Sequence, residues 1–290
     1  MNVSRSKTRV ALAVLAMAGS VGVSAAPITN LVLSGPSILW NVDPLAVGSP
    51  KPLLPNTGTL AEALAGNAAA PGGNVELNKF GGGYLPGPGV TTLSGDDGLG
   101  HSITLSSLDQ SDWGTAGSPT ALTLRYINQA AAAAGLSLSA AELSAAVTAF
   151  FTPTIACPVL PTKLCAPWQL VSDPNISYVD ITATKAHVGL EGFLNASPIL
   201  KALFPGQAAS IPSFVQVSEV VEVAFAGVDD YLFGFSATNS GVYAAGDVGR
   251  DFPLRSYSGN YDVSIPEPAS LALCGVGLLG LFFGRRRHLM

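Results

Sequence analysis

Histidine, serine and carboxylate side chains are the residues of this sequence that could carry out acid–base or nucleophilic chemistry. Away from the two ends of the chain the only histidines are His101 and His187, so a Ser-His-Asp arrangement would have to use one of them. Asp180 precedes His187 by seven residues in what has the pattern of extended chain, and an uninterrupted strand would place the two side chains on opposite faces. We therefore expect His187 to be a strand-surface or hydrogen-bonded histidine.

A serine nucleophile also lacks its usual sequence context. No Gly-x-Ser-x-Gly segment occurs, and Gly-Phe-Ser-Ala-Thr at 234–238 lacks the second glycine that relieves crowding at such a turn. The glycine runs at 71–73, 81–83 and 86–89 do not lead into a nucleotide-binding pattern, which favours turns or linkers. The sequence therefore predicts no catalytic residue and no cofactor.

Two pairs of neighbouring carboxylates are candidates for calcium. Asp96-Asp97 stands in a Ser-Gly-Asp-Asp-Gly segment, and Asp229-Asp230 has the composition of a turn, so each pair could offer two oxygens. Neither is followed by the alternating ligands and distal glutamate of an EF-hand loop. We predict solvated turns at both places and no metal site.

Six aromatic residues cluster late in the chain and suggest a possible ligand surface. They are Tyr231, Phe233, Phe235, Tyr243, Tyr257 and Tyr261. Aromatic rings at alternate strand positions can stack on sugar rings, but the same residues also build β cores. A glycan-binding surface therefore stays open as an alternative to a core role.

Helical signals are concentrated between residues 118 and 152. Ser118 and Pro119 suit the start of a first helix over 120–134, which Gly135 would stop. A second helix opens with the capping-box pattern Ser139 to Glu142, ends before Pro153 and repeats Leu143, Val147 and Phe151 on one stripe. We predict a helical hairpin whose stripe packs on the rest of the body, with binding of a partner as the alternative.

Strand patterns flank this hairpin on both sides. Residues 27–115 are rich in glycine and proline and suggest short strands such as 75–80 and 101–108, and alternation returns between 168 and 265. The later strands are expected at 176–184, 214–220, 222–225, 231–236, 242–245 and 261–264, with turns at 238–241 and 258–260 and a short helix at 197–204. The predicted fold is mainly β, of α+β type: an antiparallel sandwich-like body with a helical hairpin insertion.

The N-terminus has the order of a secretory signal peptide. Arg5, Lys7 and Arg9 precede the apolar run 10–18, and small residues follow up to Ala26. We place the signal-peptidase cut after Ala25, because a cut after Ala26 would put Pro27 next to the scissile bond. Residues 1–25 are therefore set aside as a signal peptide.

The C-terminus combines three features in series. Pro266 and Pro268 hold Glu267 in extended backbone that a processing enzyme could grip. Residues 269–284 are uncharged and are expected to form a transmembrane helix. At about 1.5 Å per residue it covers roughly 24 Å, less than the usual hydrocarbon core of about 30 Å, so it is a marginal anchor. Arg285, Arg286 and Arg287 follow and should remain cytoplasmic, which places the preceding chain across the membrane.

This Pro-Glu-Pro, short apolar helix and arginine cluster resembles the PEP-CTERM sorting signal, over about the last 26 of 290 residues. The resemblance implies recognition of Pro266, Glu267 and Pro268 by an exosortase, a membrane-embedded cysteine transpeptidase or protease of bacteria that often make exopolysaccharide. It says nothing of the exported body, because sorting tails accompany unrelated proteins.

Charge and cysteine usage agree with export. Eight basic and 18 acidic residues lie between Ala26 and Pro266, so the exported part is acidic and nucleic acid is excluded as a partner. Cys157 and Cys165 are the two cysteines of this part, and in an oxidising compartment we predict a disulfide between them. A zinc half-site is the alternative, but it lacks a second cysteine pair and a nearby histidine.

The sequence thus predicts a signal peptide (1–25), a Gly/Pro-rich region with short strands (26–115), a helical hairpin (116–153), a β-rich domain (154–264) and a sorting signal (265–290). We expect a precursor anchored in the inner membrane by residues 269–284 and facing the periplasm, then released to the cell surface or extracellular matrix. Its partners would be signal peptidase, exosortase and exopolysaccharide, and its role non-enzymatic. The alternatives are a secreted glycan-binding module and a polysaccharide hydrolase, which would need two carboxylates at a fixed separation.

Overall fold

The computed structural model describes residues 26–48, 51–77, 90–157, 162–182, 185–193, 195–244 and 257–266. The predicted signal peptide, the apolar segment 269–284 and the arginine cluster lie outside these residues. No helix within the described ranges is long and apolar enough to cross a membrane.

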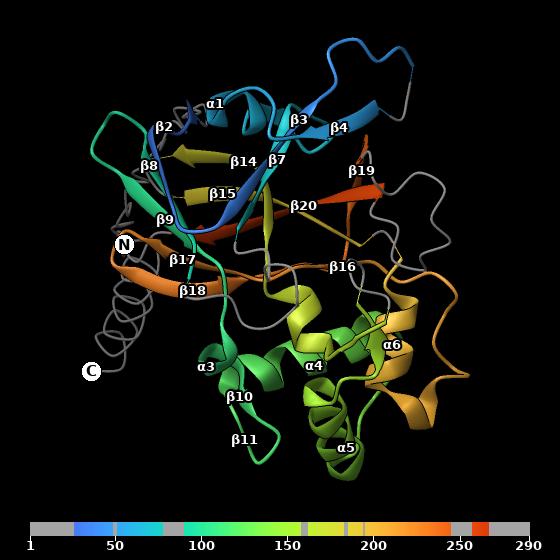
Figure 1. Ribbon diagram of the computed structural model, residues 1–290. Helices are drawn as coiled ribbons and strands as arrows, with labels where there is room; N and C mark the ends of the chain where they lie inside the picture. The colour runs from blue at the N-terminus through green and yellow to red at the C-terminus, as the bar shows by residue number, and fades with distance from the viewer. Residues whose placement is uncertain are drawn as a thin grey trace, which may run out of the picture.

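Two β-sheets form the larger part of the body (Figure 1), which confirms the prediction of a mainly β fold. The first sheet runs in the order β1 (Ala26–Pro27), β14 (Asn175–Thr182), β7 (Gly73–Leu77), β3 (Ser37–Val42), β4 (Lys51–Pro55), β19 (Thr238–Ala244), β20 (Tyr257–Pro266), β15 (Lys185–Phe193) and β16 (Val217–Ser218). Strand β14 also pairs with β15, so this sheet curls back on itself. The second sheet runs in the order β18 (Val228–Leu232), β17 (Val221–Phe225), β9 (Ser102–Ser106), β8 (Thr92–Asp96) and β2 (Thr29–Ser34).

The two sheets share one hydrophobic core. Val75, Val188 and Leu190 of the first sheet and Leu105 and Phe225 of the second are all buried in it. Both sheets mix strands from the two predicted β regions, since β7 pairs with β14 and β9 pairs with β17. One described pairing departs from the expected antiparallel pattern, because β4 and β19 run parallel.

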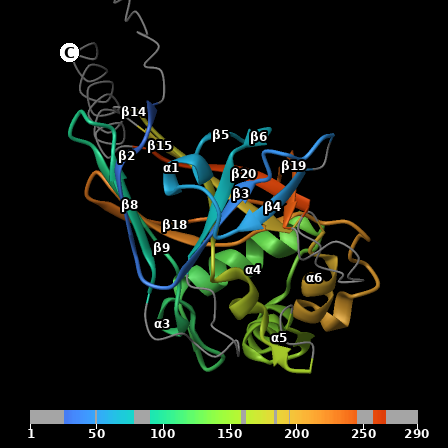
Figure 2. The same ribbon diagram turned by 45° about the horizontal axis from the view of Figure 1, so that its top comes forward.

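The helices gather beside the sheets in a separate lobe with a core of its own (Figures 1 and 2). Its members are α3 (Gln110–Trp113), α4 (Ala121–Ala133), α5 (Ala140–Phe151), the 3₁₀ helix η1 (Pro167–Val171) and α6 (Ser197–Leu203). The Trp113 ring packs edge-on against Tyr126 at 5.6 Å and against Phe150 at 5.0 Å. The hairpin α4–α5 therefore buries its apolar face mainly among helices, with Val217 and Val220 of the β body at the border.

The predicted hairpin is confirmed, with two local corrections. Gly135 follows α4 with φ of +73°, and the Ser139–Glu142 capping box opens α5. The cap of α4 is Thr120 instead of Ser118, because Ser118 and Pro119 form the short strand β11, which pairs with β10 (Gly114–Thr115).

The buried side of α5 also differs from the predicted stripe. Ala146, Val147 and Phe150 are its buried residues, whereas Leu143 and Phe151 are only partly covered. Phe150 takes the central position because Trp113 and Tyr126 lie against its ring. The stripe is therefore rotated by one residue from the one expected from sequence spacing.

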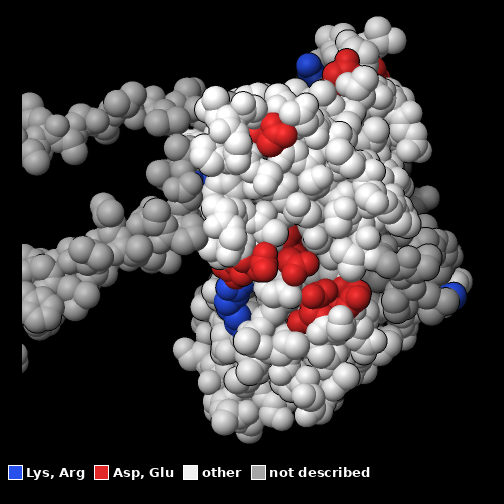
Figure 3. Space-filling model, turned by 90° about the vertical axis from the view of Figure 1, so that its left-hand side faces the viewer, with Lys and Arg blue, Asp and Glu red and all other residues white. Residues whose placement is uncertain are grey.

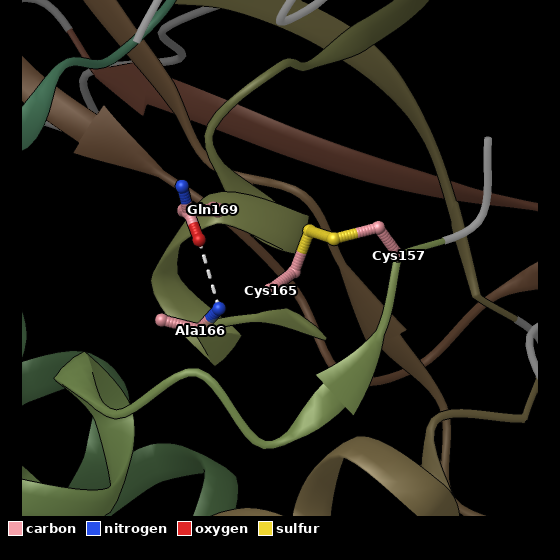
Figure 4. The surroundings of a disulfide bond; sticks show 4 residues. All are labelled: Cys157, Cys165, Ala166 and Gln169. Atoms are coloured by element: carbon pink, nitrogen blue, oxygen red, sulfur yellow. Dashed lines mark hydrogen bonds between the residues drawn. A yellow bond between two sulfur atoms is a disulfide. The ribbon is translucent and has the colours of Figure 1, made fainter. Parts of the chain in front are cut away.

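Cys157 and Cys165 are joined by a disulfide in the helical lobe, as predicted (Figure 4). Strands β12 (Ile155–Ala156) and β13 (Leu164–Cys165) pair antiparallel and bring the two Cα atoms to 5.2 Å. Both cysteines are buried, and the backbone N–H of the neighbouring Ala166 donates to Gln169 Oε1 at 2.8 Å. The disulfide thus closes the chain segment that leads from α5 into η1.

Several predicted strand limits are wrong. The strand expected over 214–220 shrinks to β16, and the turns expected at 238–241 and 258–260 lie inside β19 and β20. Within β19 the register shifts between Asn239 and Tyr243, and Asn239 Oδ1 accepts from the Gly241 N–H. These residues therefore make a local turn without ending the strand.

The remaining described elements are short. They are α1 (Leu60–Ala63), the 3₁₀ helix η2 (Pro205–Gln207) and the paired strands β5 (Gly66–Asn67) and β6 (Ala70–Pro71).

Candidate functional site

The first and last described residues of the chain, Ala26 and Pro266, lie at the same end of the large sheet. Ala26 pairs with Ile181, Ile181 with Ala186, and Ala186 with Ile265, so β1, β14, β15 and β20 are neighbours in this order. Figure 1 shows β14, β15 and β20 side by side. Three inter-strand steps of about 4.8 Å separate the two outer strands of this row. We call this end, defined by Ala26, Thr182, Lys185 and Pro266, the export end, because both predicted export signals adjoin it.

The core side of the export end is apolar and closed. Ile181, Ala186 and Ile265 are buried there, with Ile265 only 2% exposed. Ile28 follows β1, and its N–H donates to the Val179 carbonyl at 3.2 Å. Residues next to both predicted export signals are thus integral parts of the folded core.

The opposite side of the same strands carries a polar row. Asp180 lies directly across from His187, and His187 directly across from Ser264. This corrects the expectation that Asp180 and His187 point to opposite faces. Strands β14 and β15 are the two arms of a hairpin, so the chain reverses between the two residues and returns them to one face.

His187 contacts a carboxylate within this row. His187 Nδ1 lies 3.3 Å from Asp262 Oδ1, and no hydrogen bond joins the described Ser264 hydroxyl to the histidine. Burial raises the pKa of Asp180, opposed by the nearby His187. The row contains the residue types of a catalytic triad, and His187 is a hydrogen-bonded strand histidine, as expected.

Tyr178 also belongs to the polar row, and the position of its ring requires glycine at position 189. Its ring lies over Gly189, where a Cβ atom would come within 2.2 Å of Tyr178 Cε1. Burial, followed by the charges of Asp262 and Asp180, raises the pKa of the phenol. Gly189 therefore allows the tyrosine to cross from β14 towards Asp262 on β20.

The sorting motif begins inside the sheet. Pro266 is the last residue of β20 and is in register with Lys185 of β15. Glu267 and Pro268 lie outside the described residues, as do Ala25 and the predicted cytoplasmic arginines.

The Asp96-Asp97 pair organises a turn. Asp96 accepts hydrogen bonds from Asn30 Nδ2 and the Gly98 N–H, and Asp97 from the Leu99 and His101 N–H groups. His101 Nδ1 lies 2.6 Å from Asp97 Oδ2, and this hydrogen bond lowers the pKa of Asp97 to about 2. The carboxylates thus bind protein N–H groups of the β8–β9 turn and its neighbours.

The Asp229-Asp230 pair does not form the predicted turn. Both residues lie within β18, and the turn before it consists of Ala226 and Gly227, which have φ of 52° and 78°. Neighbouring strand residues point to opposite faces. Asp230 Oδ1 instead pairs with Arg125 Nη1 at 2.9 Å. Among the described residues no group of three histidine, cysteine or carboxylate side chains is arranged to hold a metal ion.

The late aromatic residues with described side chains do not form a flat platform. Tyr261 is buried, and Phe233 and Phe235 pack on Tyr126 with an angle of 88° between their own rings. Tyr231 donates its hydroxyl to Asp112 Oδ1 at 3.0 Å. These contacts favour the core interpretation. The side chains of Tyr243 and Tyr257 lie outside the described part of the structure.

A group of buried carboxylates was not predicted from the sequence. Glu76, Asn175 and Glu191 lie in register on β7, β14 and β15, and Glu76 accepts from Trp40 Nε1 at 2.9 Å. Glu219 accepts from both the backbone and the side-chain N–H of Asn175. Burial raises the pKa of Glu219 well above its usual value, with Asp173 adding to the effect. Nothing in the local sequence marks these glutamates as buried.

Acidic side chains gather on the face seen in Figure 3, where few basic ones lie. Burial, followed by the charges of Asp112 and Asp229, raises the pKa of Glu222. This agrees with the acidic balance of the sequence between Ala26 and Pro266.

Comparison with known families identifies the tail alone. Residues 264–287 match the family described as the PEP-CTERM protein-sorting motif, which confirms the resemblance found in the sequence. This motif marks exported bacterial proteins that an exosortase processes. No curated protein and no solved structure gives a significant match to the chain.

Proposed function

We propose that the chain is a precursor of a cell-surface or extracellular-matrix protein with a non-enzymatic structural or interaction role. Signal peptidase removes residues 1–25, residues 269–284 anchor the precursor in the inner membrane, and exosortase acts at Pro266-Glu267-Pro268. The observation that carries the proposal is the sorting-motif match at 264–287, which begins on the same row of strands as Ala26.

The position of β1 supports a cut after Ala25. A mature chain that starts at Ala26 keeps both residues of β1, which pair with Ile181 and Asp180. A cut after Ala26 would leave Pro27 alone, and proline has no N–H to donate to the neighbouring strand. The folded body thus favours the longer mature chain.

The residues that adjoin the two apolar export segments lie at the same end of the body, which suits a membrane-bound precursor. A protein held at both ends by apolar segments must present both ends to the same bilayer. Ala26 and Ile265 satisfy this geometry without any rearrangement, because they lie on one row of neighbouring strands.

The non-enzymatic role is supported by the way the candidate catalytic residues are used. His187 and His101 each contact a carboxylate through Nδ1, as a triad histidine also does, but Ser264 has no hydrogen bond to either histidine in the described structure. Among the late aromatic residues with described side chains, Phe233 and Phe235 pack against one another and Phe233 also packs on Tyr126. The body therefore has the features of a scaffold more than those of a hydrolase.

The proposal is tested by replacing Pro266, Glu267 and Pro268 with alanine in the full-length precursor and fractionating the cells. We expect the variant to stay in the membrane fraction with its tail attached, and intact-mass measurement of the surface fraction of the unmodified protein to give an N-terminus at Ala26 and loss of residues 269–290. Alanine substitutions at Leu45 and Val47, which are exposed loop residues, are the matched control. Unchanged release and unchanged mass in the triple variant would contradict the proposal.

A further inference from the structure

We infer that the folded body restrains its own sorting: exosortase can take the Pro-Glu-Pro motif only after the end of β20 has separated from β15, an inference that rests on the proposed function. Strand and signal share residues. The family match starts at Ser264, and β20 ends at Pro266, so Ser264, Ile265 and Pro266 belong to both.

These shared residues are held by a complete antiparallel ladder. β20 pairs with β15 from Ser258 opposite Phe193 to Pro266 opposite Lys185, without a register shift. On the core side, Ile265 is buried against the sheet-to-sheet core. On the other side, Asp262 is bound to His187. The start of the signal is therefore fixed on the core face by Ile265, and the strand residues just before it are fixed on the opposite face by Asp262.

A processing enzyme needs the same backbone. Enzymes that recognise an extended peptide bind its main chain by strand-like hydrogen bonds and place alternate side chains in pockets. Pro266 follows Ile265 with no spacer, so a cleft that encloses the motif would meet the body and strand β15. Binding by the enzyme and pairing with β15 are thus mutually exclusive for the residues next to the motif.

The opening that is required is small. In the described sheet β19 pairs with β20 only at Tyr257, Gly259 and Asn260, so the residues from 261 onwards have β15 as their single neighbouring strand. Separation of Ser264, Ile265 and Pro266 breaks three residue pairs and leaves the rest of the ladder in place. Local opening of this kind occurs at strand ends well below the free energy of global unfolding. The fraction of precursors with this end open then sets the rate of sorting.

The test is a reversible clamp across β15 and β20 in the full-length precursor, expressed in a host that carries the exosortase. His187→Cys and Ser264→Cys place two cysteines at directly opposed positions on the exposed side of the two strands. We expect the oxidised clamp to slow loss of the tail by about tenfold or more in a pulse-chase experiment, and dithiothreitol to restore the rate. The two single-cysteine variants, and unmodified precursor with dithiothreitol, control for the substitutions and for reduction of the Cys157–Cys165 disulfide.

A spacer variant separates restraint of the motif from other effects of the clamp. After Pro266 an eight-residue Gly-Ser spacer is inserted, followed by a second Ser-Ile-Pro, so that the strand and a free motif are both present. We expect this precursor to be processed several-fold faster than the unmodified one, and equally fast with the clamp closed.

The outcomes are distinguishable. If the clamped precursor is processed at the rate of the unmodified one, the restraint is overturned and the proposed function stands. The same conclusion follows if the clamp slows the spacer variant as much as it slows the precursor without the spacer. If neither the unmodified precursor nor the spacer variant loses its tail, the proposed function itself is overturned.

Discussion

The helical lobe and the export end are stabilised in opposite ways. In the lobe, Ser139 caps α5 through Glu142, and Cys157 is bonded to Cys165, so the decisive contacts join residues close in sequence. At the export end, Ala26 lies two strands from Ala186 and three from Ile265. The pairings that bring β1 and β20 into this row join distant parts of the chain, and only the β14–β15 hairpin between them is local. The start of α5 and the disulfide depend on contacts within short segments, whereas the row from β1 to β20 can form only when both ends of the body are present.

This difference indicates in which region of the molecule a mutation should change the rate of sorting. A strand end with a single neighbouring strand opens more easily than a core of packed aromatic side chains. The motif is attached to the first kind of structure, and the lobe, of the second kind, carries no export signal. Changes in the lobe should therefore alter overall stability, and changes at the export end should alter sorting.

The largest effect is expected from Phe150→Ala in the lobe core. Removal of a fully buried ring that packs on Trp113 and Tyr126 should lower the free energy of unfolding by about 3–5 kcal/mol. Urea denaturation of the purified protein followed by tryptophan fluorescence measures the loss. Phe214→Ala is the control, because Phe214 is 56% exposed and should change stability little. Equal losses in the two variants would contradict the assignment of the lobe core.

Next in size is Ile265→Ala at the export end. A buried isoleucine truncated to alanine lowers the free energy of unfolding by about 2–5 kcal/mol, and a strand end should fall at the lower limit because it can relax. Ile265→Val should lower it by only about 1 kcal/mol. Denaturation of the two variants should rank them in this order, and tail loss in cells should be fastest for Ile265→Ala. Slower tail loss in that variant would break the comparison between the two regions.

A pH-dependent effect is expected from Glu219→Gln, where the segment before β17 contacts β14. Burial raises the pKa of Glu219 in the folded state, so its contribution is favourable below the unfolded pKa and is lost as the pH rises through the folded value. Each unit by which the pKa is raised corresponds to about 1.4 kcal/mol when the group ionises. Glutamine should therefore leave stability nearly unchanged at pH 4 and raise it relative to the unmodified protein at pH 8.

Thermal melts at the two pH values measure this difference. Glu222→Gln is a matched variant, since the pKa of Glu222 is also raised and its side chain is less deeply buried. We expect the same sign with a smaller size. A gain that is larger at pH 4 than at pH 8 would show that ionisation of Glu219 is not the cause.

The smallest effect is expected from Ser139→Ala at the start of α5. Loss of the cap removes the acceptor of the Glu142 N–H and should lower the free energy of unfolding by about 1 kcal/mol. Ser144→Ala, at an exposed interior position of the same helix, should be neutral or slightly stabilising. The two variants are compared by urea denaturation, and equal effects would argue against the capping box.

The same contrast explains what the sequence could and could not predict. The hairpin α4–α5, its glycine stop, its capping box and the disulfide were predicted, because each depends on residues a few positions apart. The sorting motif was also predicted from a contiguous segment. Local physical chemistry is therefore sufficient for the existence of the hairpin, for the disulfide and for the tail, but not for the side of α5 that is buried.

The pairing of strands could not be predicted in the same way, either for the β14–β15 hairpin or between distant segments. Asp180 and His187 were placed on opposite faces because the intervening residues, Thr182 to Lys185, contain none of the glycine, proline, asparagine or aspartate residues that mark a hairpin turn. Asp229-Asp230 was assigned to a turn on composition, although Ala226 and Gly227 make it. The burial of Glu219 depends on Asn175, a contact that no local pattern encodes.

The row of strands between Ala26 and Ile265 also makes a circular permutant of the body feasible. The two residues lie roughly 14 Å apart, a gap that a linker of about five or six residues crosses when extended. A circular permutant could therefore join the old ends and open the chain at an exposed loop such as the one that carries Leu45 and Val47. The molecule would then keep its architecture while presenting new termini at a place of the experimenter's choosing.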